Sequence, residues 1–232
     1  MVIMNCPFGK VVYGSSIIIM LIISGCLNDS SDTAEKVELE GGDQDGYIQI
    51  LADLLPNITA GMIIADGEGA WVGVGMGGQN KLIMRSLFRF NMAQYERGSV
   101  EFYFKVRDLV GSPGKIDVYI VPDLGSLSTT SGDPIDLKAE WSSLNNGTRI
   151  KTVYVQTASS GSANPVGTPD DVIYAQLGRW FSITLSEEDV TGGISGGHLS
   201  IMFRARDENM DGGNAVVIST YESGDIPYYI SH

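Results

Sequence analysis

RSLFRFNM at residues 85–92 and GSVEFYFKV at residues 98–106 decide the fold. In each stretch alternate residues are apolar, which is the pattern of a β-strand with one buried face. These apolar residues are Phe88, Phe90 and Met92 in the first stretch and Val100, Phe102, Phe104 and Val106 in the second. Only residues 93–97 connect the two stretches, so we expect the strands to be neighbours at the centre of a hydrophobic core.

Shorter segments with strand character surround this pair and are separated by turns rich in Gly, Pro, Ser and Asn. We expect strands at residues 62–66, 70–74, 115–121, 150–155, 179–185, 198–206, 215–220 and 228–230. Residues 47–55 suit either a short helix or the first strand, and Ser186 is placed to cap a single helical turn. Because no sustained helical period is visible, the sequence predicts an all-β fold, an antiparallel β-sandwich of the jelly-roll type.

A glycine-rich run, GVGMGG at residues 73–78, interrupts this pattern. We expect Gly75 to Gly78 to form a loop, since so many glycines weaken a strand. The run has a superficial likeness to a dinucleotide-binding loop, but no strand–helix–strand unit surrounds it. It is therefore interpreted as a turn.

The composition narrows the function classes. The formal net charge of the 232-residue chain is -13, and this excess of carboxylates argues against a nucleic-acid partner, because affinity for phosphate backbones comes mainly from Lys and Arg. The two cysteines, Cys6 and Cys26, both lie near the N-terminus. The body of the protein therefore has no disulfide and must be stabilised by a core, which a domain of this size can bury.

Residues 1–26 have the features of a signal peptide with a lipoprotein-like cleavage site. Lys10 precedes an apolar run that ends in Ser24-Gly25-Cys26, and the run is short for a membrane span. We expect export and lipid attachment at Cys26, which would anchor the protein to the membrane at the cell surface. An ordinary signal peptide with a secreted product, or an uncleaved anchor with a chance cysteine, stays open. Residues 27–46 are polar and acidic and are predicted to be a flexible tether, and residues 47–232 to be the β-sandwich domain.

The order of the segments carries a family resemblance. Its best marks are RSLFRF at 85–90, the Asp189-Val190-Thr191 step after Trp180, and Glu222 followed by Pro227. With these marks the chain resembles the DNRLRE-type (disaggregatase-related) β-sandwich domains of exported bacterial and archaeal proteins, over about residues 63–232. The resemblance implies a carbohydrate-binding-type jelly roll without catalysis, and some relatives associate with acidic polysaccharides.

Enzyme motifs are missing from the sequence. It contains no GxSxG elbow, no HExxH and no paired cysteine ligands. Adjacent acids such as Glu187 and Glu188, or Asp170 and Asp171, are in principle capable of acid–base work on a glycoside. Neighbouring acids on a surface loop are far more often solvated charges, so we expect a protein that is not an enzyme.

A calcium loop is a second hypothesis. Asp207, Asn209 and Asp211 present oxygen side chains at alternate positions, as in the first half of a calcium-binding loop. The closing Glu is missing, because position twelve counted from Asp207 is Ile218. Asp and Asn beside Gly are also ordinary hairpin chemistry, so Ca²⁺ and a simple turn are both open.

Sugar binding needs exposed aromatic rings flanked by polar groups. The aromatic candidates are Trp71, Trp141, Trp180, Tyr95, Tyr119 and Tyr174. We favour Trp141, beside Asn145, and expect Trp180 to be in the core because its strand is dense. Arg85 and Arg89 share one strand face, as do Arg204 and Arg206. These rows suit either the carboxylates of acidic sugars or salt bridges within the protein.

The sequence as a whole predicts an exported, lipid-anchored surface protein with a noncatalytic module that binds cell-envelope or extracellular polysaccharide, including acidic polysaccharide. Two alternatives remain: a structural or adhesion module that binds protein, and a polysaccharide-degrading enzyme. An exposed Trp or Tyr cluster on a concave sheet would favour the polysaccharide-binding module, and a flat apolar patch would favour the structural or adhesion module. A deep cleft with opposed carboxylates would favour the enzyme.

Overall fold

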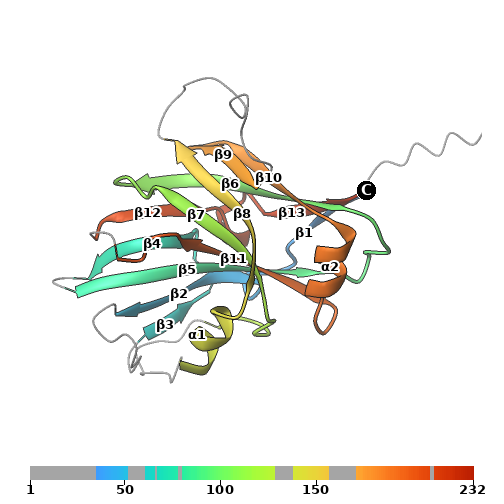
Figure 1. Ribbon diagram of the computed structural model, residues 1–232, viewed down its shortest axis with the longest axis horizontal. Helices are drawn as coiled ribbons and strands as arrows, with labels where there is room; N and C mark the ends of the chain where they lie inside the picture. Colours follow the sequence, from blue (N-terminus) through green and yellow to red (C-terminus); the bar gives the residue numbers. More distant parts are fainter. Residues whose placement is uncertain are drawn as a thin grey trace, which may run out of the picture. The chain divides into compact units, whose positions relative to one another are not determined.

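The computed structural model describes residues 35–51, 61–65, 67–77, 80–128, 138–156, 171–209 and 212–232. The predicted signal peptide, Cys26 and Asp170 lie outside these residues. Most of what is described is β-strand (Figure 1).

Thirteen strands and two short α-helices make up the described elements. The strands are β1 (Lys36–Glu38), β2 (Asp45–Leu51), β3 (Gly61–Ile64), β4 (Ala70–Gly77), β5 (Asn80–Asn91), β6 (Val100–Val110), β7 (Lys115–Val121), β8 (Thr148–Gln156), β9 (Val172–Gln176), β10 (Trp180–Leu185), β11 (His198–Ala205), β12 (Asn214–Ile218) and β13 (Tyr228–Ser231). The helices are α1 (Lys138–Leu144), α2 (Glu187–Gly193) and a 3₁₀ turn, η2 (Tyr221–Ser223).

The strands form one curved sheet in which β6 belongs to both layers. The hydrogen-bonded order is β1-β13-β6-β12-β4-β5-β11-β7-β8-β9, with β10 also on β6, and β2 and β3 beyond β5. The first half of β6 pairs with β10 and β13, and its second half pairs with β12. The predicted all-β sandwich is confirmed. One pair, β8 with β9, is parallel, which departs from an entirely antiparallel sheet.

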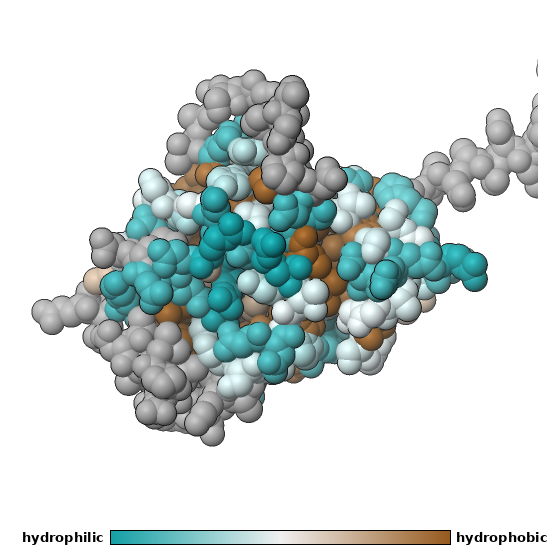
Figure 2. All heavy atoms as spheres, viewed as in Figure 1, coloured by the Kyte–Doolittle hydropathy of each residue, from teal (hydrophilic) through white to brown (hydrophobic). Residues whose placement is uncertain are grey.

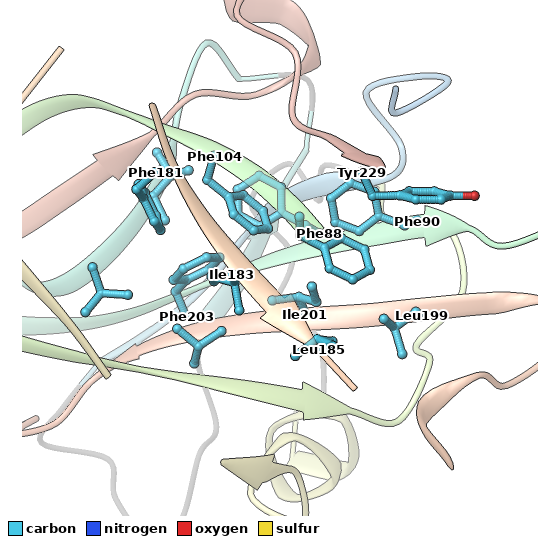
Figure 3. Packing of buried hydrophobic residues seen from close by; sticks show 14 of the residues in the cluster. Phe88, Phe90, Phe104, Phe181, Ile183, Leu185, Leu199, Ile201, Phe203 and Tyr229 are labelled. Atoms are coloured by element: carbon cyan, nitrogen blue, oxygen red, sulfur yellow. The ribbon is translucent and has the colours of Figure 1, made fainter. Parts of the chain in front are cut away.

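The core lies between β5 and β6, which face each other from opposite layers. Ring centroids of Phe88 and Phe104 are 5.1 Å apart, and those of Phe90 and Phe102 are 4.9 Å apart. Phe203 joins the same cluster edge-on, 4.8 Å from Phe104 (Figure 3). The two decisive stretches are therefore neighbours, as predicted, through ring packing rather than through backbone hydrogen bonds. Such edge-to-face pairs add about 0.5–1.5 kcal/mol each beyond the area they bury.

Two predicted boundaries are wrong. The folded part begins inside the predicted tether, because β1 pairs with β13 and the Leu39 side chain beyond it is buried. Gly75 to Gly77 of the predicted loop belong to a strand, because β4 continues to Gly77 and pairs with both β5 and β12; Gly78 lies outside the described residues. Gly73 has a φ of 139° there, and a Cβ at this position would overlap the backbone carbonyl oxygen of Asn214. Glycine lets the two strands approach closely.

The outer face of the sheet has its own apolar layer beneath α1. Ile48, Ile83, Leu87 and Met202 of the three neighbouring strands β2, β5 and β11 pack there with Leu144 and Trp141 of the helix. The ring of Trp141 is thereby fixed against the sheet. The second helix, α2, begins as predicted, with Ser186 and Asp189 forming a capping box.

Candidate functional site

Three of the predicted sugar-binding residues meet in one network, in which Arg85 and Trp141 are buried and Asn145 is exposed. The Arg85 guanidinium donates from Nε and Nη2 to the two carboxylate oxygens of Glu208, at 2.7 and 2.8 Å. Its Nη1 donates to Oδ1 of Asn145 at 2.9 Å, and its Cζ lies 3.7 Å from the ring centroid of Trp141. The side chain of Arg85 is 3% exposed. The sequence therefore identified groups that contact one another.

Their burial changes what they can do. Trp141 is 3% exposed, so the prediction that it forms an open sugar platform is wrong. The cause is α1, which turns Trp141 and Leu144 inward onto the apolar layer. Three donors of Arg85 are already used by Glu208 and Asn145, which leaves the guanidinium committed to the protein itself. This network is a structural clamp between α1, β5 and the chain after β11.

Arg89 is committed in the same way. Its Nε and Nη2 donate to the Asp123 carboxylate at 2.8 and 3.1 Å, and its Nη2 lies 3.0 Å from Nδ1 of His198. Burial raises the pKa of Asp123, but the hydrogen bonds from Arg89 and from the Gly125 N–H outweigh it and hold that pKa below its ordinary value. The pocket beside Arg89 and Ser200 has about 10 Å³ of free space, room for about one water molecule and too little for a sugar.

The second arginine pair also forms salt bridges. Arg206 donates from Nε to the Asp117 carboxylate at 3.0 Å and from Nη2 to the Thr152 hydroxyl at 2.6 Å. Burial raises the pKa of Asp117, but the hydrogen bonds from Arg206 and Thr152 prevail and lower it. Arg204 lies 3.8 Å from the Glu208 carboxylate. Of the two readings of the arginine rows, the structure shows internal ion pairs.

The predicted calcium loop is only partly described. Oδ1 of Asp207 accepts the backbone N–H of Asn209 at 2.9 Å, which is the hydrogen bond of an Asx turn. Glu208 points away from that turn to Arg85. Asp211 lies outside the described residues. Within the parts of the chain that are described, no group of three or more His, Cys, Asp or Glu side chains is arranged to hold a metal ion, and calcium binding stays a prediction.

A partly exposed aromatic cluster lies elsewhere, on the outer side of β10, β6 and β13. It consists of Trp180, Tyr103 and Tyr228, which we call the aromatic face. The rings of Tyr103 and Tyr228 stack at 4.6 Å with an interplanar angle of 9°, and Trp180 lies 5.4 Å from Tyr228 at 57°. Trp180 is 40% exposed, so the prediction that it belongs to the core is wrong.

Strand alternation explains this arrangement and was readable in the sequence. Phe181, Ile183 and Leu185 of β10 are buried. Trp180, which precedes them at the start of β10, lies on the opposite side of the strand together with the polar residue Ser182. Tyr103 stands directly across the ladder from Ser182 on one side and from Tyr228 on the other. The many apolar residues of this strand suggested that Trp180 is buried, whereas the alternation with the polar residue Ser182 indicated that it faces solvent.

A hydrogen bond stiffens the Tyr103 side of the aromatic face. The Tyr103 hydroxyl donates to Oε2 of Glu101 at 2.6 Å. This bond to a carboxylate raises the pKa of Tyr103 to about 12. Burial raises the pKa of Glu101, but hydrogen bonds from Ser182 and Tyr103 and the nearby His232 lower it overall. Glu101 is therefore a carboxylate, and Tyr103 a neutral phenol, near neutral pH.

Two ion pairs flank the rings. The Lys105 ammonium lies 2.8 Å from the Asp225 carboxylate, and Lys105 is directly opposite Trp180 in the strand register. On the other edge the Lys36 ammonium lies 2.6 Å from Glu38 and 4.2 Å from the ring centroid of Tyr228. Both pairs are partly exposed. The aromatic face is thus an open indole beside a tyrosine pair, with charged hydrogen-bonding groups around it.

Hydrophobic and hydrophilic residues also mix on the side of the molecule seen in Figure 2, where hydrophilic side chains form a broad central area with smaller hydrophobic areas between them. Among the described residues, none of the helices is both long enough and apolar enough to cross a membrane. Lipid attachment at Cys26 lies outside the described residues and stays a prediction.

Comparisons with known proteins add little to these contacts. No protein-family model matches the chain. No curated protein sequence matches it. Among solved structures, it is similar to the K1 cleaved adhesin domain of Lys-gingipain from Porphyromonas gingivalis W83, with 12% sequence identity, coverage of 85% of this chain and 90% of that chain, and a TM-score of 0.29.

Proposed function

We propose that the chain is an exported, lipid-anchored surface protein that binds polysaccharide without catalysis, and that the aromatic face is its binding surface. The observation that carries this proposal is the exposure of Trp180 beside the stacked pair of Tyr103 and Tyr228. An indole that is open to solvent offers a flat apolar surface for the apolar side of a sugar ring. Its polar surroundings offer partners for the sugar hydroxyl groups.

The surroundings of Trp180 favour sugar over a protein partner. A protein-docking patch is a contiguous apolar area, whereas Trp180 has an ion pair, Lys105 with Asp225, directly beside it. Of the other exposed large apolar residues, Met76 and Tyr221 are on different elements, Val110 is at the far end of β6, and Leu177 precedes Trp180 by three residues. A solvent-exposed surface that combines an aromatic ring with charged hydrogen-bonding groups suits ligands rich in hydroxyl groups.

The acid–base properties of the surface support binding rather than hydrolysis. Glycoside hydrolysis needs a carboxylic acid whose pKa is raised, opposite a second carboxylate. Glu101, Asp117 and Asp123 each have a lowered pKa. Such groups are ionised at neutral pH and do not act as general acids.

The anchor follows from Cys26, which stands at the end of the apolar run of a lipoprotein-like signal. A lipid on this cysteine would hold the sandwich at the cell surface, where envelope or extracellular polysaccharide is within reach. Membrane fractionation and intact mass of wild type and Cys26→Ala test this part. We expect the lipid mass and membrane association to disappear together in the variant, and retention of both would contradict the anchor.

Binding is tested with the full chain on a panel of immobilised polysaccharides. We expect saturable binding that weakens at least tenfold in Trp180→Ala, equivalent to about 1.4 kcal/mol. Tyr221→Ala is the matched control, because Tyr221 is exposed to 39% but lies outside the aromatic face. Equal binding by all three proteins would exclude the aromatic face, and no binding to any polysaccharide would favour the structural or adhesion module.

A further inference from the structure

We infer that the ligand of the aromatic face is a neutral polysaccharide, and that acidic polysaccharides bind there more weakly. This inference rests on the proposed function and adds the chemical class of its ligand. It departs from the expectation that the arginine rows bind acidic sugars. The charged groups on and near the face favour a neutral ligand.

Both lysines of the aromatic face already have a carboxylate partner. The Lys36 ammonium lies 2.6 Å from Oε1 of Glu38, and the Lys105 ammonium lies 2.8 Å from Oδ2 of Asp225. A uronate or sulfate would have to compete with these carboxylates for each ammonium. Exposed pairs contribute little to stability, yet they neutralise the field that an acidic ligand would need at a distance.

The remaining charges near the face are one carboxylate and one cation. Glu101 is ionised, and its neighbour His232 lies 3.6 Å away and is charged only when protonated. With Lys36 and Lys105 balanced by Glu38 and Asp225, Glu101 and the exposed Arg179 beside Trp180 leave the surroundings of the face with about no net charge at neutral pH. The whole chain has a formal net charge of -13, which adds a repulsive background for any polyanion.

The arginines that suit bidentate recognition of carboxylates are used inside the protein. Arg85 is paired with Glu208 and Arg89 with Asp123, each through two donors. Arg206 is paired with Asp117. These three arginines, which would distinguish a uronate from a neutral sugar, are therefore bound to the chain's own carboxylates, and Arg179 is the exposed arginine next to Trp180.

A neutral sugar, by contrast, finds complementary groups around Trp180. Its ring would stack on the indole, and its hydroxyl groups would donate to the carboxylates of Asp225 and Glu101 and accept from the Lys105 ammonium. Hydrogen bonds to charged groups are shorter and stronger than those between neutral groups. Lys105 is opposite Trp180 in the strand register and is paired with Asp225, which places a donor and an acceptor side by side for adjacent hydroxyl groups.

The test compares a neutral glucan or galactan with a polyuronate of matched chain length, at low and high salt, using the full chain. We expect the neutral polymer to bind tenfold or more tightly than the polyuronate, with affinity unchanged by salt and dependent on Trp180. Asp225→Asn frees the Lys105 ammonium, and we expect this variant to gain polyuronate binding that high salt removes. Arg179→Gln is the control for the exposed cation next to Trp180 in sequence, and we expect it to bind as wild type does.

The outcomes separate the two proposals. Tighter, salt-weakened binding of the polyuronate by wild type, still dependent on Trp180, overturns the neutral ligand but leaves the proposed function standing. Loss of polyuronate binding in Arg179→Gln would overturn the same inference by identifying the responsible cation. Binding of neither polymer overturns the neutral ligand together with the proposed function.

Discussion

Replacing Glu208 by Gln would leave the buried Arg85 cation without its counter-ion. Arg85 is 3% exposed and Glu208 15% exposed, and the pair is bidentate at 2.7 and 2.8 Å. The Gln side chain has nearly the same shape, so packing against Trp141 should be preserved and the change isolates the charge. Removing one member of a buried ion pair costs about 3–5 kcal/mol.

We expect the lower end of that range, a loss of about 3 kcal/mol in the free energy of unfolding. The reason is that Gln keeps one acceptor for the guanidinium and that Asn145 and Trp141 still contact Arg85. Urea unfolding followed by circular dichroism measures it. With a slope of about 2–3 kcal/mol per molar urea, the midpoint should fall by about 1 M or more.

Two further variants control this measurement. Glu38→Gln breaks an exposed ion pair whose side chains are 50% and 44% exposed, and we expect a change below about 1 kcal/mol. The double variant Arg85→Met with Glu208→Leu replaces both charges, so we expect it to be more stable than Glu208→Gln alone. A change within about 0.5 kcal/mol for Glu208→Gln would refute the buried clamp and return Arg85 to the list of candidate ligand-binding groups.

Three other predictions follow from the core and the acid–base groups. Phe104→Ala removes a ring that packs against Phe88 and Phe203 of the opposite layer, and we expect a loss of about 3–5 kcal/mol in urea unfolding; a loss below about 1 kcal/mol would contradict the packing. Tyr103, with its pKa at about 12, stabilises the fold below pH 10, and this contribution is lost as pH rises toward 12. In Glu101→Gln, the phenolate absorbance of Tyr103, found by subtraction of a Tyr103→Phe spectrum, should appear nearer pH 10. An unchanged titration would exclude the hydrogen bond. Asp117, whose pKa lies below its ordinary 3.8, stabilises the fold above that pH and loses this contribution as pH falls further, so Asp117→Asn should flatten the acid limb of stability against pH, whereas an identical acid limb would contradict the ion pair.

The hydrophobic core could be predicted from the sequence because strand alternation is local. Phe88 and Phe104 follow a period of two that needs no knowledge of the partner strand. The pairing order could not be predicted in the same way, because β5 and β6 are adjacent in sequence yet lie in opposite layers. The glycines that follow Gly73 were wrongly predicted to form a loop for a related reason. The close approach of Gly73 to β12 depends on a strand more than a hundred residues away.

The candidate site was predicted less well, and two tryptophans show why. Trp141 stands in a polar segment, but α1 buries it against an apolar layer formed by distant strands. Trp180 stands in an apolar segment, but its place in the alternation turns it outward. Local polarity was a poor guide to the burial of either ring, and position within the period was the better guide for Trp180. Arg85, Asn145 and Trp141 were each predicted to bind sugar, and the structure shows that they contact one another.

The most direct test of the aromatic face is the indole N–H signal of each tryptophan. The chain has three, Trp71, Trp141 and Trp180, and a Trp180→Phe variant assigns the signal of interest in the NMR spectrum of the ¹⁵N-labelled full chain. On titration with a neutral oligosaccharide, we expect the Trp180 signal to move to saturation while the buried Trp141 signal stays in place. Movement of Trp141 with an unchanged Trp180 would contradict the aromatic face as the binding surface.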